Sequence, residues 1–335
     1  MDPHAALSEI AGLLERERSS RYKSRAFRVA ADAVAGLTDA QLDDVAVLRR
    51  TKGIGESTLA VIVQARAGVV PDYLADLRTR AGVEQDSRLR GLLRGDLHAH
   101  SDWSDGLTSP ALMAAGAREL GHEYLALTDH SPRLRVAHGL SADRLRAQRD
   151  VVGGLGTDAF TMLWGIEVDI LDDGELDQDA ELLAQLDVVV ASVHSKLRMD
   201  ADAMTRRMVA AVAGGRVDVL GHVTGRLVEG ARGMRPPSVF DAAAVFDACA
   251  AHGVAVEINS RPERQDPPEE LIAIALAAGC LFSIDSDAHA PGQLSLLDHG
   301  ARRAEDAGIP ADRIVTTWSL PRLKEWIAGR RPRGA

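Results

Sequence analysis

The chain has 335 residues, 26% of them charged, and a formal net charge of −10 at pH 7. This length suits one large domain plus a small one, and the sequence shows neither a run of 18 apolar residues nor a secretory signal pattern at its start, so we expect no membrane span. Two cysteines argue against a disulfide framework and a thiolate metal site, and they favour a cytoplasmic protein.

The first 80 residues predict helices only. Apolar residues recur at helical spacing over 6–14 and 26–34, and Thr38 is a predicted N-cap for a helix over 39–50. A further helix follows the glycine-containing turn at 53–55. We therefore expect a small all-α domain over residues 1–80 and a polar linker over 81–91.

Charge is distributed unevenly along the chain. Residues 1–90 hold 14 Lys/Arg and 13 Asp/Glu, whereas the remaining residues hold 25 and 36, a net of −11. Six basic residues lie close together in the helical part: Arg16, Arg18, Arg21, Lys23, Arg25 and Arg28. Such a cluster indicates either contact with nucleic acid or a solvated helix face.

Over residues 92–335, short apolar runs alternate with helix-length segments. Candidate strands lie near 92–97, 123–128, 161–168, 187–193, 217–221, 254–258 and 281–285. This alternation predicts a parallel sheet with right-handed crossovers. Seven such units predict a barrel, whose site would lie where the carboxyl ends of the strands converge.

Residues of metal-ligand type follow six of the seven predicted strands, and Asn259, a candidate substrate contact, ends the other. The ligand candidates are His98, His100, Asp105, His130, Glu167, His194, His222, Asp287 and His289. A lone histidine at a strand end is more often structural, but nine such residues at one end of a barrel indicate a metal centre. Imidazole mixed with carboxylate suits Zn²⁺, Mn²⁺ or Fe, and Glu167 could bridge two ions. Two or three divalent ions so placed predict hydrolysis of phosphate esters.

A family resemblance is carried by the blocks HAHSDWSDG, LTDHSPRLRVAHGL, GIEVDILDDGELD, VVVASVHSKL, VDVLGHVTGR, VEINSRPER and IDSDAH. They resemble the PHP (polymerase and histidinol phosphatase) domain, most closely the C-terminal domain of bacterial family X DNA polymerases. The resemblance covers residues 91–335 and implies a distorted (βα)7 barrel. It also implies phosphoesterase activity, with 3′–5′ exonuclease and DNA-repair end processing as family roles.

The resemblance also implies a trinuclear centre. Carried over by motif, the ligand sets are His98, His100, Glu167 and Asp287 for the first ion, Glu167, His194 and His222 for the second, and Asp105, His130 and His289 for the third. Among these ligands we expect Glu167, His194 and His289 to be catalytic.

The N-terminal part resembles the lyase-like domain of the same polymerases, through RYKSRAFRVAADAV and the helix-hairpin-helix segment LRRTKGIGESTLAVI. Lys23 matches a lysine that binds a DNA 5′-phosphate, and Gly53 and Gly55 would let backbone amides approach a phosphate. Val61 stands where animal members have the nucleophilic lysine, and Ser57 replaces a nearby phosphate-binding lysine. Schiff-base chemistry is therefore not expected.

No Gly-Ser loop followed by a paired-aspartate strand lies between the two parts, so we expect no polymerase palm. Arg226 and Arg261 are candidate phosphate clamps, or else form surface salt bridges. The leading hypothesis is a metal-dependent phosphoesterase that binds the DNA backbone without sequence specificity. A small-molecule phosphatase of the histidinol-phosphate type shares the metal set but leaves residues 1–80 unexplained. A non-enzymatic DNA-binding or regulatory protein is the third alternative. No membrane or protein partner is indicated.

Overall fold

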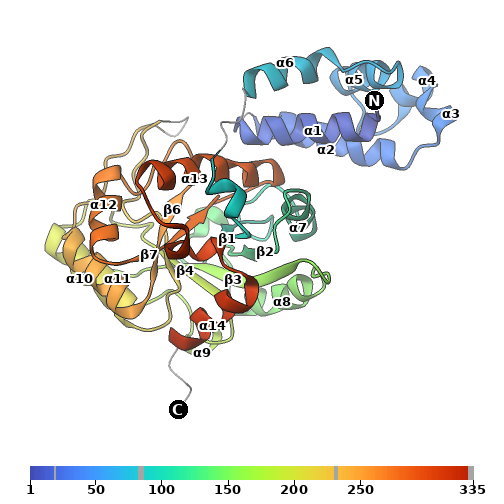
Figure 1. The fold of residues 1–335 in the computed structure, drawn as a ribbon. Helices are drawn as coiled ribbons and strands as arrows, with labels where there is room; N and C mark the ends of the chain where they lie inside the picture. Colours follow the sequence, from blue (N-terminus) through green and yellow to red (C-terminus); the bar gives the residue numbers. More distant parts are fainter. Residues whose placement is uncertain (19, 82–86, 230–232, 331–335) are drawn as a thin grey trace. The chain divides into compact units, whose positions relative to one another are not determined.

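A computed structural model describes the chain except for residues 19, 82–86, 230–232 and 331–335 (Figure 1). The chain divides into two compact units, residues 1–85 with 290–293 and residues 86–289 with 294–335. The linker was expected over residues 81–91. Residues 82–86 lie outside the described residues, whereas Leu89 is fully buried in the core of the second unit.

The N-terminal unit is helical. Its helices are α1 (Pro3–Arg16), α2 (Arg21–Ala35), α3 (Asp39–Leu42), α4 (Val45–Arg50), α5 (Glu56–Arg66) and α6 (Asp72–Ala81). Leu7, Ile10 and Leu14 recur at helical spacing on α1 and are buried with Phe27 of α2 and Ile62 of α5. The apolar stripes predicted from the sequence therefore form one small core.

The helix expected over residues 39–50 is two helices instead of one. Thr38 caps α3 in a reciprocal capping box with Gln41, as its sequence position predicts. The Asp44 side chain then accepts hydrogen bonds from the amides of Ala46 and Val47 and starts α4. The break arises because an aspartate inside the segment competes as a second N-cap.

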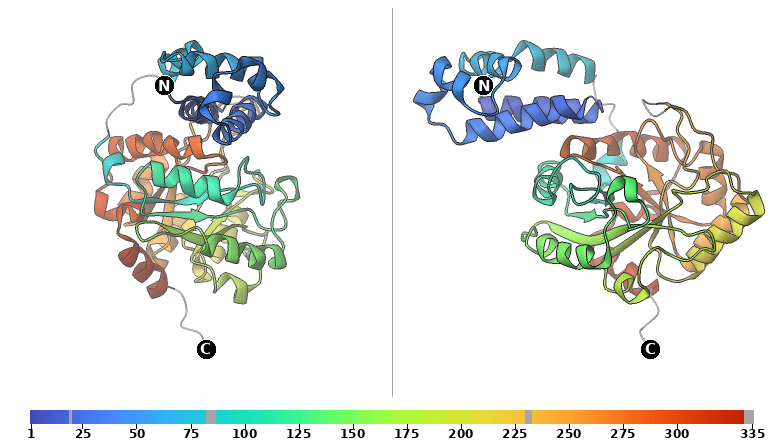
Figure 2. Two further views of the ribbon diagram at one scale, coloured as in Figure 1. Left: turned by 90° about the vertical axis from the view of Figure 1, so that its right-hand side faces the viewer. Right: turned by 180° about the vertical axis from the view of Figure 1, so that it is seen from behind.

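The second unit is a barrel of seven parallel strands in the order β1 to β7 (Figures 1 and 2). The strands are β1 (Gly95–Ala99), β2 (Tyr124–Leu127), β3 (Thr161–Asp169), β4 (Val188–Ser192), β5 (Val219–Leu220), β6 (Ala255–Asn259) and β7 (Leu281–Asp285). Ala99, the last residue of β1, bridges Ala288 after β7, so the ring is nearly closed. The predicted seven-stranded barrel is confirmed.

Helices surround the strands (Figure 2). They are α7 (Pro110–Glu119), α8 (Ala142–Gly153), α9 (Ala180–Leu183), α10 (Ala201–Ala213), α11 (Ala242–His252), α12 (Glu269–Ala277), α13 (Leu297–Asp306) and α14 (Leu320–Arg330). Both faces of every strand are buried, as is usual in parallel sheets covered by helices. None of the described helices is long and apolar enough to cross a membrane.

The barrel interior is layered. Leu163, Gly165, Glu167 and Asp169 alternate along β3, so they share one face of the strand. Leu163 belongs to a core with residues of the other strands and of α14, whereas Glu167 and Asp169 follow toward the carboxyl end. The amino-terminal half of the interior is thus an apolar floor beneath a layer of charged side chains.

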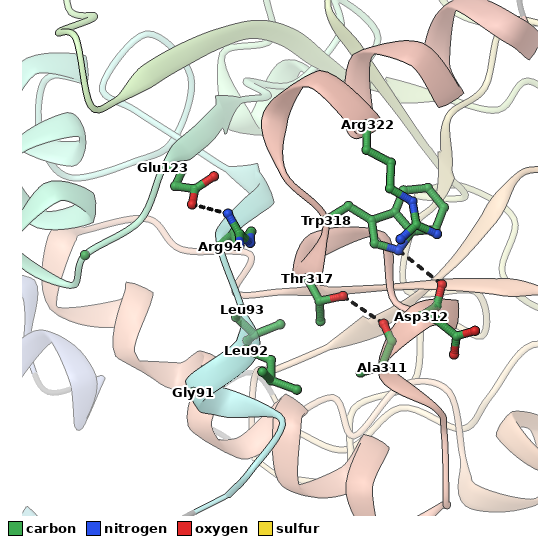
Figure 3. A pocket seen from close by; sticks show the side chains of 11 residues that line it. Gly91, Leu92, Leu93, Arg94, Glu123, Ala311, Asp312, Thr317, Trp318 and Arg322 are labelled. Atoms are coloured by element: carbon green, nitrogen blue, oxygen red, sulfur yellow. Dashed lines mark hydrogen bonds and ion pairs between the residues drawn. The ribbon is translucent and has the colours of Figure 1, made fainter.

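A cavity of about 450 Å³ lies at the amino-terminal end of the barrel strands, near the start of β1 and β2 (Figure 3). Its lining includes Arg94, which pairs with Glu123, and Arg322, whose guanidinium stacks 3.9 Å from the centre of the Trp318 ring. None of the ligand candidates lines this cavity. The metal-ligand side chains gather instead at the carboxyl ends of the strands.

Candidate metal centre

Glu167 on β3 lies at the centre of the cluster and is 1% exposed. Its Oε1 is 2.9 Å from His222 Nε2 and 3.3 Å from His194 Nε2. Its Oε2 is 2.8 Å from His130 Nδ1 and 3.4 Å from His98 Nε2. One carboxylate therefore faces imidazoles that follow or belong to four other strands, so Glu167 could bridge two ions, as expected from the sequence.

The remaining candidates surround this centre. His100 Nε2 is 3.5 Å from Asp287 Oδ1, and Asp105 Oδ1 is 3.4 Å from the Nε2 atoms of both His130 and His289. Three groups have ligand atoms within 4.8 Å of one another: His98, His100 and Asp287; His100, Asp105, His130 and His289; and His130, Glu167 and His194. The structure thus brings all nine candidates together.

The polar atoms of the cluster fit a bound cation. His98 Nε2, both ring nitrogens of His100 and both carboxylate oxygens of Glu167 are buried without a hydrogen-bond partner among the described residues. Buried polar atoms left unpaired cost stability, so native proteins rarely retain so many in one place. Divalent ions among these atoms would satisfy them, and the oxygen and imidazole set suits Zn²⁺, Mn²⁺ or Fe.

Charge in the cluster also favours a cation. Burial tends to lower the pKa of His194, but Glu167 and Asp169 outweigh it and raise the pKa to about 10. Burial and the neighbouring His289 and His130 lower the pKa of His100 to about 3, so its ring is neutral and its lone pair is available. The carboxylates therefore attract positive charge while at least one imidazole stays ready to bind it.

Two further carboxylates, those of Asp169 and Glu257, orient ligand candidates by contacting the ring nitrogen that faces away from the cluster. Asp169 Oδ1 is 2.5 Å from His194 Nδ1, and Glu257 Oε1 is 2.5 Å from His98 Nδ1. A carboxylate behind a ligating imidazole fixes its tautomer and ring direction. Asp169 and Glu257 were not among the site residues predicted from the sequence. The signal was present, because each lies two positions from a recognised strand residue, Glu167 or Asn259, and so shares its face.

Arg264 is a third site residue that was not predicted from the sequence. Its Nε donates to Asp287 Oδ2 at 3.0 Å, and Asn259 Nδ2 donates to the same oxygen at 3.1 Å. Burial would raise the pKa of Asp287, but Arg264 and Arg261 hold it well below its usual value. Asp287 is therefore kept as a carboxylate, the form in which it can bind a metal.

The two candidate phosphate clamps lie in different places. Arg261 Nη1 donates to the Asp287 carbonyl at 2.9 Å and lies 3.1 Å from His289 Nδ1, so its guanidinium borders the cluster. Arg226 donates instead to the carbonyls of Arg264 and Gln265. The guanidinium of Arg226 supports the loop that carries Arg264, and its contact with phosphate stays a prediction.

The comparisons with known proteins agree with this geometry. A family model described as "PHP domain" matches residues 96–261. The chain is 30% identical over 231 residues to a protein named a probable phosphatase of Enterobacter sp. (strain 638), covering 66% of this chain and 88% of that protein. The chain belongs to the PHP domain family. Because the chain belongs to this family and its barrel holds the His/Asp/Glu cluster, we identify the barrel as a metal-dependent phosphoesterase.

Two other similarities concern proteins with more specific names. The PHP chain is 34% identical over 239 residues to the DNA polymerase/3'-5' exonuclease PolX of Bacillus subtilis (strain 168), covering 71% of this chain and 41% of that protein. It thus spans less than half of that relative. The histidinol phosphate phosphatase of Lactococcus lactis, solved with zinc, L-histidinol and phosphate, has a TM-score of 0.46, 18% identity, and coverage of 65% of this chain and 94% of that chain.

Proposed function

We propose that this PHP protein hydrolyses phosphate esters in DNA, as a 3′–5′ exonuclease or a repair end-processing nuclease, with two or three divalent ions (Mn²⁺ or Zn²⁺, or Fe). One observation carries the proposal. The same chain holds a metal-ligand cluster at a barrel mouth and a helical unit with an open, glycine-capped helix N-terminus beside a basic helix. A phosphatase for small metabolites has no need of the second feature.

The glycine turn before α5 is the first part of the expected DNA contact. Gly53 has a φ of +97°, and a Cβ there would lie 2.7 Å from Val29 Cγ1, so this glycine is required by the turn and by its packing on α2. Gly55 is the N-cap of α5, and a Cβ there would meet nothing within 4 Å. A phosphate can therefore approach the first amides of α5, where the helix dipole favours an anion.

The exposed side of α2 is the second part. Lys23 and Arg25 are exposed, and no ion pair is recorded for either among the described residues. Arg28 differs, because it pairs with the buried Glu15 at 2.6 Å and so belongs to the structure of the unit. Tyr22 is 71% exposed, and the Arg21 guanidinium lies 5.3 Å from the centre of its ring. These groups suit contact with a phosphate backbone, which needs no sequence-specific readout.

Chemistry at the barrel follows from the side chains around the cluster. Bound divalent ions would supply Lewis acidity and lower the pKa of a water molecule. Glu167, with His194 and His289, would hold those ions in the space between their ligand atoms. Arg261 borders the same space and forms an ion pair with Glu263. We expect its guanidinium also to bind an oxygen of the phosphate that is attacked. No serine or cysteine nucleophile is needed.

A substrate panel tests the proposal. Purified protein is assayed with Mn²⁺ and separately with Zn²⁺ on single-stranded DNA, recessed 3′ ends, abasic-site duplex, 3′-phosphate ends and histidinol phosphate. We expect release of nucleotides or phosphate from at least one DNA substrate at far lower substrate concentration than from histidinol phosphate. Activity on histidinol phosphate alone would reject the DNA assignment.

A small-molecule phosphatase is the second candidate. It is favoured by the similarity to the probable phosphatase of Enterobacter sp., which this chain covers over 88% of its length. The two candidates share the barrel and differ in the role of residues 1–80. The panel separates them by substrate. In addition, only the nuclease should lose activity on its substrate when the helical unit is altered at Gly55.

A further inference from the structure

Arg207 on α10 is the largest fully buried side chain of the described residues. Taking a guanidinium out of water costs several kcal/mol unless its donors are satisfied, so a buried arginine requires an explanation. The nearest carboxylate oxygen recorded, Asp172 Oδ1, is 4.0 Å from Arg207 Nη1 and belongs to a partly exposed residue. An ion pair is therefore not the main reason for this burial.

The donors of Arg207 are used on two chain segments. Its Nε and Nη2 donate to the carbonyl of Ile170, with Nε at 3.2 Å. Its Nη1 donates to the carbonyl of Ser195 at 2.9 Å, and Nη2 reaches Ser195 Oγ at 3.3 Å. A planar guanidinium can make these bonds together because its donors form a rigid fork, which a lysine lacks.

The two segments are those that carry a pair of site residues. Ile170 directly follows Asp169 at the end of β3, and Ser195 directly follows His194 after β4. Asp169 Oδ1 is 2.5 Å from His194 Nδ1 and so sets the direction of the imidazole, whose Nε2 faces Glu167 at 3.3 Å. The Arg207 guanidinium thus links the two segments that carry Asp169 and His194, through the carbonyls of the residues that follow them.

We infer that Arg207 is a positioning residue for one part of the metal centre, the group formed by His130, Glu167 and His194. It touches neither substrate nor metal and acts through the carbonyls of Ile170 and Ser195. The inference rests on the metal-dependent function proposed above. Among the described residues, no hydrogen bond joins Arg207 to the group formed by His98, His100 and Asp287, so this group should be unaffected.

The test compares Arg207→Met with Arg313→Met in the full chain. Arg313 is a matched control because its Nε and Nη2 also donate to a backbone carbonyl, that of Cys280, but at the amino-terminal end of β7. Mn²⁺ is titrated into each protein, and the free ion is followed by electron paramagnetic resonance. We expect Arg207→Met to raise the dissociation constant of one class of sites about 10- to 100-fold, the range typical of residues behind a ligand, and to leave the others unchanged. Arg313→Met should change only the thermal midpoint.

Two further variants separate positioning from folding. Arg207→Lys should show a smaller defect than Arg207→Met, because an ammonium can reach only part of the carbonyl set. Added guanidinium ion at low concentration should restore Mn²⁺ binding to Arg207→Ala but not to His194→Ala. If Arg207→Met, or Arg207→Ala without added guanidinium, folds and binds Mn²⁺ as the wild type does, Arg207 is a packing residue and the inference is rejected. If the wild-type chain itself binds no Mn²⁺ or Zn²⁺, the proposed function fails with it.

Discussion

The Glu257 carboxylate joins two ligand candidates, His98 and His222, from different strands. Its Oε1 is 2.5 Å from His98 Nδ1, and its Oε2 accepts a hydrogen bond from the backbone N–H of His222. Glu257 is fully buried on β6, between β5 and β7. One side chain therefore sets the ring direction of His98 on β1 and the backbone position of His222 after β5.

Glu257→Gln should weaken metal binding without unfolding the barrel. The amide keeps the size of the side chain but loses the charge that holds the His98 tautomer, so metal affinity should fall about 10- to 100-fold. Calorimetric titration with Zn²⁺ measures this. The control is Glu123→Gln, at the opposite end of the barrel, where an exposed pair with Arg94 is lost and metal affinity should not change. Equal affinities for the wild type and Glu257→Gln would contradict the orienting role.

Glu167→Ala should remove hydrolysis almost completely. This carboxylate faces four imidazoles, so its loss should weaken the binding of every ion that it contacts. Loss of a residue that only hydrogen-bonds to a metal ligand lowers activity by up to roughly 100-fold, and Glu167→Ala should lower activity by more than that. The control is Glu181→Ala, at an exposed position on α9. Metal analysis of active wild-type protein should find more than one ion per chain. A single ion in fully active protein would reject a multinuclear centre.

His122 should make the barrel less stable in mild acid. Burial, and then the Arg90 charge, lower the pKa of His122 to about 4 from 6.5, and neither ring nitrogen has a hydrogen-bond partner among the described residues. As pH falls from 6.5 to 4, His122 becomes protonated in the unfolded chain but stays neutral in the folded chain. The free energy of unfolding should therefore fall by about 1.4 kcal/mol per pH unit from this group.

Urea unfolding at several pH values, with chelator present, measures the effect of His122. The slope of the unfolding free energy against pH should be smaller in His122→Gln than in the wild type. His252→Gln alters an exposed histidine at the end of α11 and should leave the slope unchanged. If His122→Gln and the wild type have the same slope, the imidazole is not held neutral by burial.

Gly55 offers a test of the DNA contact that spares the fold. Its φ of −105° is open to any residue, and both Ser and Asp are good N-caps, so Gly55→Ser and Gly55→Asp should fold alike. A carboxylate about 4 Å from a phosphate costs about 1 kcal/mol in water, so Gly55→Asp should bind DNA about fivefold more weakly than Gly55→Ser. The difference should shrink as salt rises.

The Gly55 comparison is made by fluorescence anisotropy on labelled DNA at low and moderate salt. Hydrolysis of a small chromogenic phosphate ester should be the same in both variants, because the cluster lies wholly in the barrel unit. Identical DNA affinity and identical salt dependence in Gly55→Ser and Gly55→Asp would show that this helix N-terminus does not contact DNA. The small-molecule phosphatase would then be the better proposal.

We expect no 5′-deoxyribose phosphate lyase activity from the helical unit. The resemblance of residues 1–80 to the lyase-like domain implies that Val61 takes the place of the nucleophilic lysine. Val61 is 2% exposed within the core and offers no amine to an aldehyde. Borohydride trapping with an incised abasic-site duplex checks this. A covalent adduct on residues 1–80 would overturn the prediction and would point to Lys23 or Lys52.

Local pattern alone determined much of this protein. Two-residue alternation and strand-end position are properties of neighbouring residues, so the seven strands and the nine ligand candidates could be recognised before any contact was known. The helix break at Asp44 was missed although it is local, because Thr38 and Asp44 are both good N-caps and the periodic pattern favoured one helix.

Tertiary structure decided which side chains share a space. Glu257 meets His98 only because β6 and β1 converge at one mouth of the barrel, and Arg226 turns to the carbonyls of Arg264 and Gln265 because the neighbouring loop offers them. Arg207 could not be distinguished from a solvated helix residue by sequence, since its partners are backbone carbonyls of residues 12 and 37 positions away. Hydrogen bonds to backbone leave no trace in residue identity, so only the folded chain reveals them.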